Sequence, residues 1–449
     1  MPPSSPEESS LRKRRNSASI WTMLSFGSDS VLRLISNLIL TRLLSPEVFG
    51  LMALARIFLQ GIKMFSDVGT KASIVRSDRG DEVEFLQTAW TVQVIRGLLI
   101  SLVACLIAWP VSRIYEQDVL FPLICVLSVT PIFAGFSTIS SSTVNRKMLL
   151  RVKTTLGIVN QIITTIITAL AAWWLGTVWA LAIGAVIGSC LSMVLGHIFL
   201  PRFQHRFRWE GEAVGELFRF GRWILLGTLF TYLGNRGRLA IQGLLVPVEV
   251  LGMITLAAMI AWMPGRLFSK VLGDVIFPSF SEIRRKRPQD LNKALAKVRV
   301  AMTLVVFPVF FVISFFAQPI IDLMYDDRYA AAGPILSFMA LNSALSMLGM
   351  PYQNIMLAEG RSGLHATFTF IYSTCSILGT IIGFYLYGIL GMFIGVAIGT
   401  MVYFSCLVVM GYRNGYRTWM LDVMALAAIG VVYVYTVMTT TLPANLSGL

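Results

Sequence analysis

Apolar residues occur along the chain in long runs, and short polar segments separate one run from the next. Each run is about 20 residues long, which is the length that an α-helix needs to cross a hydrocarbon core roughly 30 Å thick. This pattern predicts an all-α polytopic membrane protein with about thirteen spanning helices. The predicted spans are residues 19–42, 47–69, 86–110, 118–140, 153–175, 177–200, 220–243, 248–277, 300–324, 331–357, 364–387, 391–411 and 419–440.

The composition supports the membrane assignment. Of the 449 residues, 56% are hydrophobic and only 13% are charged, whereas a soluble protein of this length needs more polar surface. The net charge of +14 would suggest nucleic acid in a soluble protein. Here most Lys and Arg residues lie between the predicted spans, where charge determines topology. We therefore expect membrane lipids as partners and no nucleic acid.

The basic residues are concentrated in every second loop between the predicted spans. The positive-inside rule then predicts a cytoplasmic N-terminus, with the thirteenth span leaving the C-terminus outside. The basic loops contain Lys71, Arg76 and Arg79; Arg146, Lys147, Arg151 and Lys153; Arg202, Arg206 and Arg208; Arg284, Arg285, Lys286, Arg287, Lys293, Lys297 and Arg299; Arg361; and Arg413 and Arg417.

An internal repeat predicts the architecture. The segment LLSPEVFGLMALA at residues 43–55 recurs as LLVPVEVLGMITLA at residues 244–257, with one residue inserted. Two copies in the same orientation predict two six-helix lobes related by a parallel repeat, with the substrate between them. The predicted domains are a cytoplasmic basic tail (1–18), an N-lobe of helices 1–6 (19–200), a cytoplasmic linker (201–219), a C-lobe of helices 7–12 (220–411) and an extra C-terminal transmembrane helix (412–449).

Charged side chains inside the predicted spans indicate a candidate site, because such charges are costly and usually face a cavity or a partner. On the first, second, seventh and eighth spans they recur at helical spacing and form polar stripes. Converging stripes predict a water-filled central cavity of positive potential, in which guanidinium groups bind phosphate. The candidate substrate-binding residues are Arg33, Arg56, Lys63, Arg96, Arg236, Arg238, Arg266 and Lys270.

Simpler interpretations of several of these residues remain open. Lys63 and Lys270 could extend their ammonium groups to the membrane surface. Asp29 and Arg33, four residues apart, could form a structural ion pair. Asp29 and Asp274 are the acids placed where a coupling proton or sodium ion could bind.

The familiar catalytic and metal-binding motifs are missing from the sequence. No GxxxxGK[ST], HExxH, paired CxxC or GxSxG pattern occurs, and the five cysteines all fall in apolar runs. We therefore expect no enzyme activity, catalytic residue, cofactor or metal.

The opening WTMLSFGSDSVLRLISNLILTRLLSPEVFGLMALARIF and the later FSDVGTKASIVR resemble the start of bacterial polysaccharide transporters. These are the O-antigen and exopolysaccharide flippases of the multidrug/oligosaccharidyl-lipid/polysaccharide superfamily. The resemblance implies a bacterial inner-membrane flippase that moves undecaprenyl-pyrophosphate-linked oligosaccharides from the cytoplasmic to the periplasmic leaflet by alternating access. Related flippases use cavity arginines at positions where Arg33, Arg56 and Arg266 stand here. A thirteenth helix departs from the twelve or fourteen that are common in the family.

The partners that the resemblance implies are the lipid-linked glycan, a polysaccharide polymerase and export proteins, and we expect a monomer. Two other functions remain open. A multidrug or cation antiporter of the same superfamily would favour an acidic cavity, whereas cations outnumber acids in these spans. A membrane polysaccharide polymerase would need a large outer loop, and the longest predicted outer loop, near residues 322–329, is short.

Overall fold

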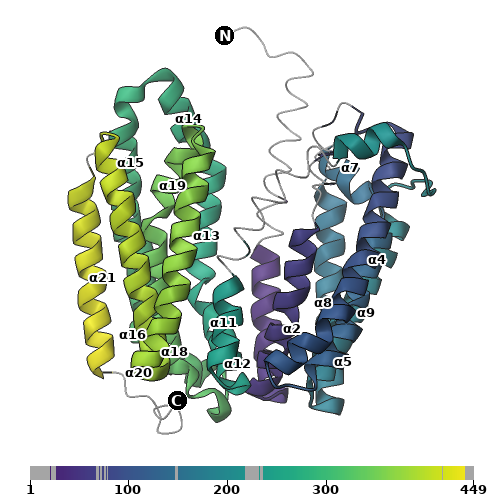
Figure 1. Cartoon of the computed structure of the whole chain (residues 1–449), viewed down its shortest axis with the longest axis horizontal. Coiled ribbons are helices and arrows are strands. Elements are labelled where there is room, and N and C mark those ends of the chain that lie inside the picture. Colours follow the sequence, from purple (N-terminus) through teal and green to yellow (C-terminus); the bar gives the residue numbers. More distant parts are fainter. Residues whose placement is uncertain are drawn as a thin grey trace. The chain divides into compact units, whose positions relative to one another are not determined.

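The computed structural model describes residues 21, 27–66, 70, 73–74, 77, 79–146, 150–217, 232, 236–416 and 418–439. These residues are almost entirely helical, and no β-strand occurs among them. The predicted all-α fold class is therefore confirmed. The chain divides into two compact units, Met1–Leu229 and Phe230–Leu449, which we call the N-terminal and the C-terminal unit. Figure 1 shows the helices of each unit in sequence colours.

In the N-terminal unit, residues 27–43 form the first described helix. Helices α4 and α6 cross so closely that a Cβ atom on Gly97 would lie 2.6 Å from the carbonyl oxygen of Pro131. Helices α8 and α9 pack along each other, and α2 contacts α4, α5 and α9. The helices that follow are α2 (Pro46–Phe65), α4 (Val83–Ile114), α5 (Leu120–Leu127), α6 (Val129–Phe136), α7 (Ser140–Arg146), α8 (Leu150–Leu175) and α9 (Val178–Phe199), and residues 211–217 are also helical.

The C-terminal unit is built around α18, which contacts α12, α16, α17, α20 and α21. Several predicted spans appear here as consecutive helices interrupted by π-helical turns. The elements are α11 (Arg238–Leu245), α12 (Val248–Ala261), α13 (Met263–Val271), η2 (Leu272–Ile276), α14 (Phe277–Lys286), η3 (Pro288–Asp290), α15 (Leu291–Ala301), η4 (Met302–Val306), α16 (Phe307–Phe315), α17 (Ala317–Met324), η5 (Asp327–Tyr329), α18 (Ala332–Leu348), α19 (Met350–Ala358), α20 (Ser362–Arg413) and α21 (Trp419–Thr439).

Helix α20 consists of two helices that meet at a break. Tyr387 and Gly388 have non-helical backbone angles, and the positive φ of 59° at Gly388 is a conformation that glycine adopts without steric cost. On either side of the break, glycines bring the two backbones into direct contact. A Cβ atom on Gly395 would lie 1.9 Å from the carbonyl oxygen of Gly379, and one on Gly383 would lie 1.9 Å from that of Gly391.

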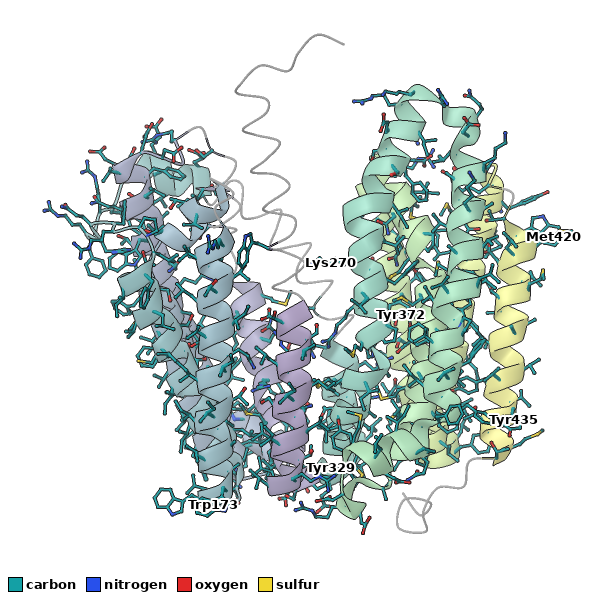
Figure 2. The ribbon with its side chains drawn as sticks, turned by 180° about the vertical axis from the view of Figure 1, so that it is seen from behind. Trp173, Lys270, Tyr329, Tyr372, Met420 and Tyr435 are labelled. Carbon is teal, nitrogen blue, oxygen red and sulfur yellow. The ribbon has the colours of Figure 1, made fainter. Side chains whose placement is uncertain are left out.

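Seven helices among the described residues are long and apolar enough to cross a membrane. The pair Val248–Ala261 and Met263–Lys270, bent by 41°, makes eight if it is one span. Exposed aromatic residues such as Trp173 and Tyr435 lie near the ends of α8 and α21 (Figure 2), as is typical of side chains at membrane surfaces. The protein is thus a multi-pass membrane protein. The number thirteen stays a prediction, because parts of the first and seventh predicted spans lie outside the described residues.

Candidate functional site

The candidate cations of the N-terminal unit lie on the first helix, α2 and α4. Arg33 and Arg56 are exposed, and Lys63 in the last turn of α2 is half-buried. Arg56 lies two turns before Lys63 on the same face of α2, and Arg96 reaches the Lys63 carbonyl oxygen. The structure therefore brings these three cations together.

Arg96 also has a structural role. Its Nη2 donates a hydrogen bond to the Lys63 carbonyl oxygen at 2.7 Å, and its Nε donates to Ser66 Oγ at 3.1 Å. Both acceptors lie at the C-terminal end of α2, where carbonyl groups lack helical partners and favour a cation. Arg96 of α4 thus holds the end of α2 and adds positive charge beside Lys63.

The two candidate ion-coupling acids are placed differently. Asp29 is half-buried on the first helix, and no ion pair joins it to Arg33 among the described residues. The structural ion pair that the spacing allowed is therefore not formed. Asp274 belongs to the π-helical turn η2, and its side chain lies outside the part of the chain that the structure describes.

The candidate cations of the C-terminal unit lie on two segments. Arg236 is exposed in a π-helical turn just before α11, and Arg238 begins that helix half-buried. Arg266 is exposed and Lys270 is half-buried on α13, four residues apart and hence on one face. Figure 2 shows Lys270 among the side chains of this unit.

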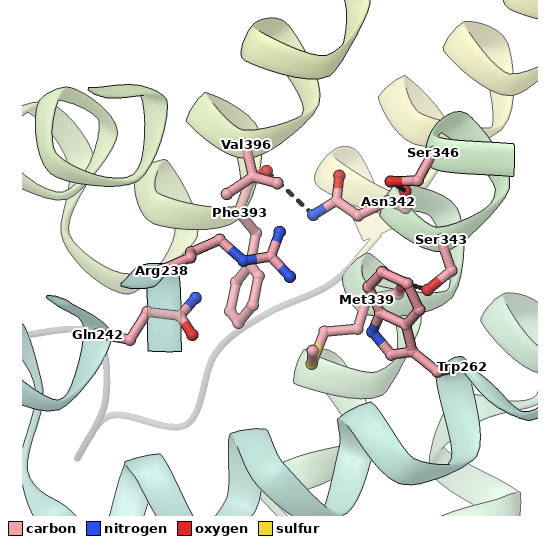
Figure 3. Close-up of a pocket in the computed structure, with 9 residues that line it drawn as sticks. All are labelled: Arg238, Gln242, Trp262, Met339, Asn342, Ser343, Ser346, Phe393 and Val396. Atoms are coloured by element: carbon pink, nitrogen blue, oxygen red, sulfur yellow. Dashed lines mark hydrogen bonds between the residues drawn. The ribbon is translucent and has the colours of Figure 1, made fainter. Parts of the chain in front are cut away.

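Arg238 contributes to a small pocket inside the C-terminal unit (Figure 3). The pocket has a volume of about 10 Å³, which is enough for about one water molecule. The guanidinium group of Arg238 and the amide of Gln242 point into it. The lining residues are Arg238, Gln242, Trp262, Met339, Asn342, Ser343, Ser346, Phe393 and Val396.

A buried ion pair in the C-terminal unit escaped the sequence analysis. Arg299 and Asp422 have side chains only 3% and 1% exposed, and Arg299 Nε lies 3.1 Å from Asp422 Oδ1. This contact is an ion pair without the alignment of a hydrogen bond. The prediction that Arg299 is a loop cation is wrong, because it lies within α15 and is buried. A carboxylate in an otherwise apolar thirteenth span was the signal that could have identified Asp422.

Neighbouring groups complete this buried cluster. Arg299 Nη1 donates to the carbonyl oxygen of Leu348 at 2.6 Å, at the break between α18 and α19. Tyr352 Oη donates to Asp422 Oδ2 at 2.6 Å, and its ring lies 4.4 Å from the Arg299 guanidinium. Thr418 is within hydrogen-bonding distance of both Tyr352 and Asp422. The cluster fastens α21 to α15 and to the broken helix α18–α19.

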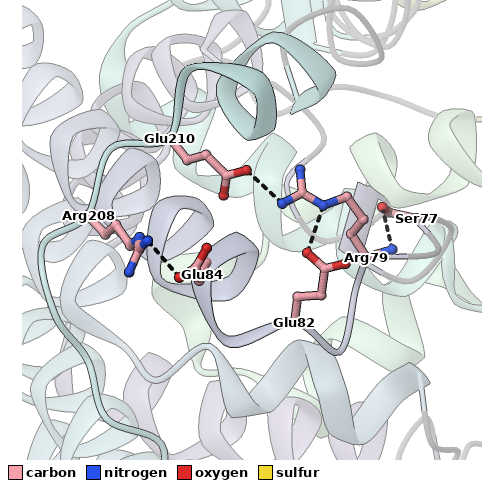
Figure 4. A network of polar contacts seen from close by, with 6 residues as sticks. All are labelled: Ser77, Arg79, Glu82, Glu84, Arg208 and Glu210. Atoms are coloured by element: carbon pink, nitrogen blue, oxygen red, sulfur yellow. Dashed lines mark hydrogen bonds and ion pairs between the residues drawn. The ribbon is translucent and has the colours of Figure 1, made fainter.

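The first half of the predicted linker is an ordered segment packed on the N-terminal unit. Gln87 Nε2 donates to the carbonyl oxygen of Gln204, and the Arg208 N–H donates to Thr91 Oγ1, both at 3.1 Å. Arg79 pairs with Glu82 and Glu210, and Arg208 pairs with Glu84 (Figure 4). The basic residues Arg79 and Arg208 are therefore neutralised by acids and are not candidates for substrate binding.

A second pocket, of about 410 Å³, lies beside this segment and includes His197, Arg202 and His205 among its lining residues. The rings of His197 and His205 are 5.1 Å apart. Burial, with a smaller effect of His197, lowers the pKa of His205. A neutral imidazole beside one arginine is a weaker anion site than the grouped cations on the helices.

Apolar helices of spanning length define the chain as a polytopic membrane protein. A family model described as "Polysaccharide biosynthesis protein" matches residues 39–334. The chain belongs to this family.

Named relatives agree with the family. The chain is 20% identical over 395 residues to the lipopolysaccharide biosynthesis protein WzxC of Escherichia coli K12, covering 86% of this chain and 78% of that protein. It is 21% identical over 326 residues to the succinoglycan biosynthesis transport protein ExoT of Rhizobium meliloti, covering 72% of this chain and 65% of ExoT.

Solved structures share the fold. An inward closed conformation of the lipid II flippase MurJ matches with a TM-score of 0.69 at 14% identity, covering 94% of this chain and 93% of MurJ. An inward-facing multidrug resistance MATE family transporter of the MOP superfamily matches with a TM-score of 0.64 at 12% identity, covering 92% and 96%. These likenesses concern the fold alone, which flippases and drug transporters have in common.

Together, the family and the relatives assign the chain to the transporters of polysaccharide biosynthesis. Among these relatives, ExoT is named for transport and not for catalysis. The chain is a transporter and not an enzyme.

Proposed function

We propose that the protein flips undecaprenyl-pyrophosphate-linked oligosaccharide repeat units from the cytoplasmic to the periplasmic leaflet of a bacterial inner membrane. The pyrophosphate and its sugars would bind the candidate cations while the polyprenyl chain stays in the lipid. Alternating access of the two lobes, with the N-terminus in the cytoplasm, would carry the headgroup across. Export of surface polysaccharide is the process that this transport would serve.

The grouping of Arg56, Lys63 and Arg96 carries the proposal. Like charges held close together repel one another, and a group of cations attracts an anion. A pyrophosphate would relieve this repulsion, and arginine can bind its oxygens by paired, charge-assisted hydrogen bonds. A cationic drug would increase the repulsion, which favours a flippase over a multidrug antiporter.

The test is complementation of a strain that lacks its own flippase for the matching polysaccharide. Arg56→Ala and Arg266→Ala should each reduce surface polysaccharide at least about tenfold, since each removes a charge-assisted contact worth roughly 1.5–3 kcal/mol. Protein levels in the membrane should stay normal. The matched controls are Arg113→Ala on α4 and Arg413→Ala at the end of α20, which are exposed arginines outside the candidate site.

Unchanged polysaccharide in both Arg56→Ala and Arg266→Ala would refute the cationic mechanism. A drug-resistance assay in the same strain addresses the antiporter: resistance that depends on the protein, without polysaccharide export, would favour that function instead.

A further inference from the structure

We propose that the pocket beside the end of α9 binds the headgroup of an anionic phospholipid of the surrounding bilayer. The headgroup that fits is a phosphodiester that carries hydroxyl groups, as in phosphatidylglycerol. The pocket is the one that includes His197, Arg202 and His205 in its lining. Its ligand would be a membrane lipid and not the transported glycan, so this inference does not depend on the proposed function.

The pocket lies where a spanning helix leaves the membrane. Helix α9 is long and apolar enough to cross a bilayer, and it ends at Phe199. The side chains of Ile198 and Phe199 are 64% and 58% exposed, so in a membrane they contact lipid chains. The pocket is lined by His197 and by residues 201–205, directly after this end of α9. A lipid whose chains lie along Ile198 and Phe199 therefore has its headgroup beside the pocket.

The pocket has room for a headgroup and a wall that is held in place. Its volume of about 410 Å³ is within the range of roughly 300–1,000 Å³ that is typical of small-molecule sites. Ser140 Oγ donates to the carbonyl oxygen of Pro201 at 2.8 Å, and Gln87 Nε2 donates to that of Gln204 at 3.1 Å. Both contacts fix the backbone of the lining segment, so the side chains of Arg202 and Gln204 stay available to a ligand.

The charge of the pocket matches a single negative charge. Arg202 is exposed, and its guanidinium group has no hydrogen bond or ion pair with any residue that the structure describes. None of the described lining residues is acidic, and burial lowers the pKa of His205, which keeps that imidazole neutral near pH 7. One guanidinium group can bind a phosphodiester through two N–H donors. A pyrophosphate carries more charge and is better matched by the grouped cations Arg56, Lys63 and Arg96.

His197 and Gln204 supply acceptors for the hydroxyl groups of the headgroup. His197 Nδ1 lies 2.9 Å from the carbonyl oxygen of Met193. Because a carbonyl oxygen only accepts, Nδ1 carries the proton and Nε2 of the neutral ring is an acceptor. The side-chain amide of Gln204 has no hydrogen bond to any described residue and offers one acceptor and two donors. A choline headgroup has no hydroxyl donor and no net negative charge, so phosphatidylglycerol fits better than phosphatidylcholine.

The test is native mass spectrometry of the purified full-length protein in detergent. The probes are phosphatidylglycerol, phosphatidylcholine and phosphatidylmethanol with the same acyl chains. The first phosphatidylglycerol should bind at least about tenfold more tightly than the first phosphatidylcholine, because of the charge-assisted bond to Arg202. Arg202→Gln should remove this preference. Phosphatidylmethanol, a phosphodiester without hydroxyl groups, should bind with intermediate affinity, and His197→Phe should weaken only phosphatidylglycerol.

Arg206→Gln is the matched control, because Arg206 is an exposed arginine of the same segment that is not among the lining residues. This variant should keep the preference, and thermal unfolding verifies that each variant is folded. Equal binding of phosphatidylglycerol and phosphatidylcholine overturns the inference. So do equal losses in Arg202→Gln and Arg206→Gln, which would indicate a general attraction of a basic segment to anionic lipid.

Two further outcomes count against the site as described. Displacement of phosphatidylglycerol by an equal concentration of inorganic phosphate would overturn the inference in favour of a site for free phosphate. Equal affinity for phosphatidylmethanol and phosphatidylglycerol would overturn the assignment of His197 and Gln204 as hydroxyl acceptors.

Discussion

Two arginines of the C-terminal unit illustrate two uses of a cation in an apolar protein. Arg299 is 3% exposed and faces Asp422, a backbone carbonyl and an aromatic ring. Arg238 is half-buried and lines a pocket without an acid, and its polar contact within the described part of the chain is a 3.5 Å approach to the Ser376 hydroxyl. Both side chains lie among helices of the same unit, so the difference lies in the partner and not in the fold.

The comparison shows that an acid partner distinguishes the structural arginine, Arg299, from Arg238. A buried cation that pairs with an acid of the protein holds helices together. Its removal leaves the acid buried without a counterion. A cation that the protein leaves without an acid keeps its donors for a ligand that supplies one. Arg96 is an intermediate case, because a carbonyl and a hydroxyl oxygen accept its hydrogen bonds.

The largest effect is expected when the ion pair is broken from one side. Asp422→Ala leaves Arg299 buried without its counterion, and such a loss destabilises a protein by about 3–5 kcal/mol. We expect a strongly lowered unfolding temperature in detergent and little protein in the membrane. Asp422→Asn should be milder, because it can still accept the hydrogen bond from Tyr352.

The double variant Arg299→Met with Asp422→Leu is the control for this interpretation. Replacing both charges by apolar groups of similar size is often neutral, so the double variant should be more stable than Asp422→Ala alone. A double variant that is less stable than Asp422→Ala would contradict the assignment of a structural ion pair.

A smaller effect is expected for Arg96. Arg96→Ala removes two hydrogen bonds at the end of α2 and should lower the free energy of unfolding by about 1–3 kcal/mol. Thermal unfolding measures this change, and Arg113→Ala on the same helix should stay within about 0.5 kcal/mol of the unmodified protein. Equal stability of the two variants would show that Arg96 does not hold α2.

Much of the fold could be predicted, because a run of about 20 consecutive apolar residues is enough to identify a spanning helix. Apolar runs of spanning length predicted α4, α8, α9 and α21, and two runs separated by three residues predicted the two helices of α20. The 41° bend at Trp262 leaves no mark in hydropathy, and its signal in the sequence is Pro264, two residues further on. The π-helical turns, η2 and η4 among them, likewise leave no mark in hydropathy.

The candidate site could be predicted only as a set of residue types. Helical spacing correctly placed Arg266 and Lys270 on one face of α13. Whether a charge is neutralised depends on partners distant in the chain: Arg299 and Asp422 are joined by tertiary packing, and Arg96 meets α2 through another helix. The role of each candidate cation in substrate binding stays a prediction.

The glycine contacts inside α20 limit how the C-terminal unit can deform. Gly383 and Gly391 touch through their backbones, as do Gly379 and Gly395, so no side chain at these points can change rotamer to let the two segments slide. We expect the two segments to move together as one body. A hinge within this unit would then lie outside α20. The bent junction of α12 and α13 is the candidate position for it.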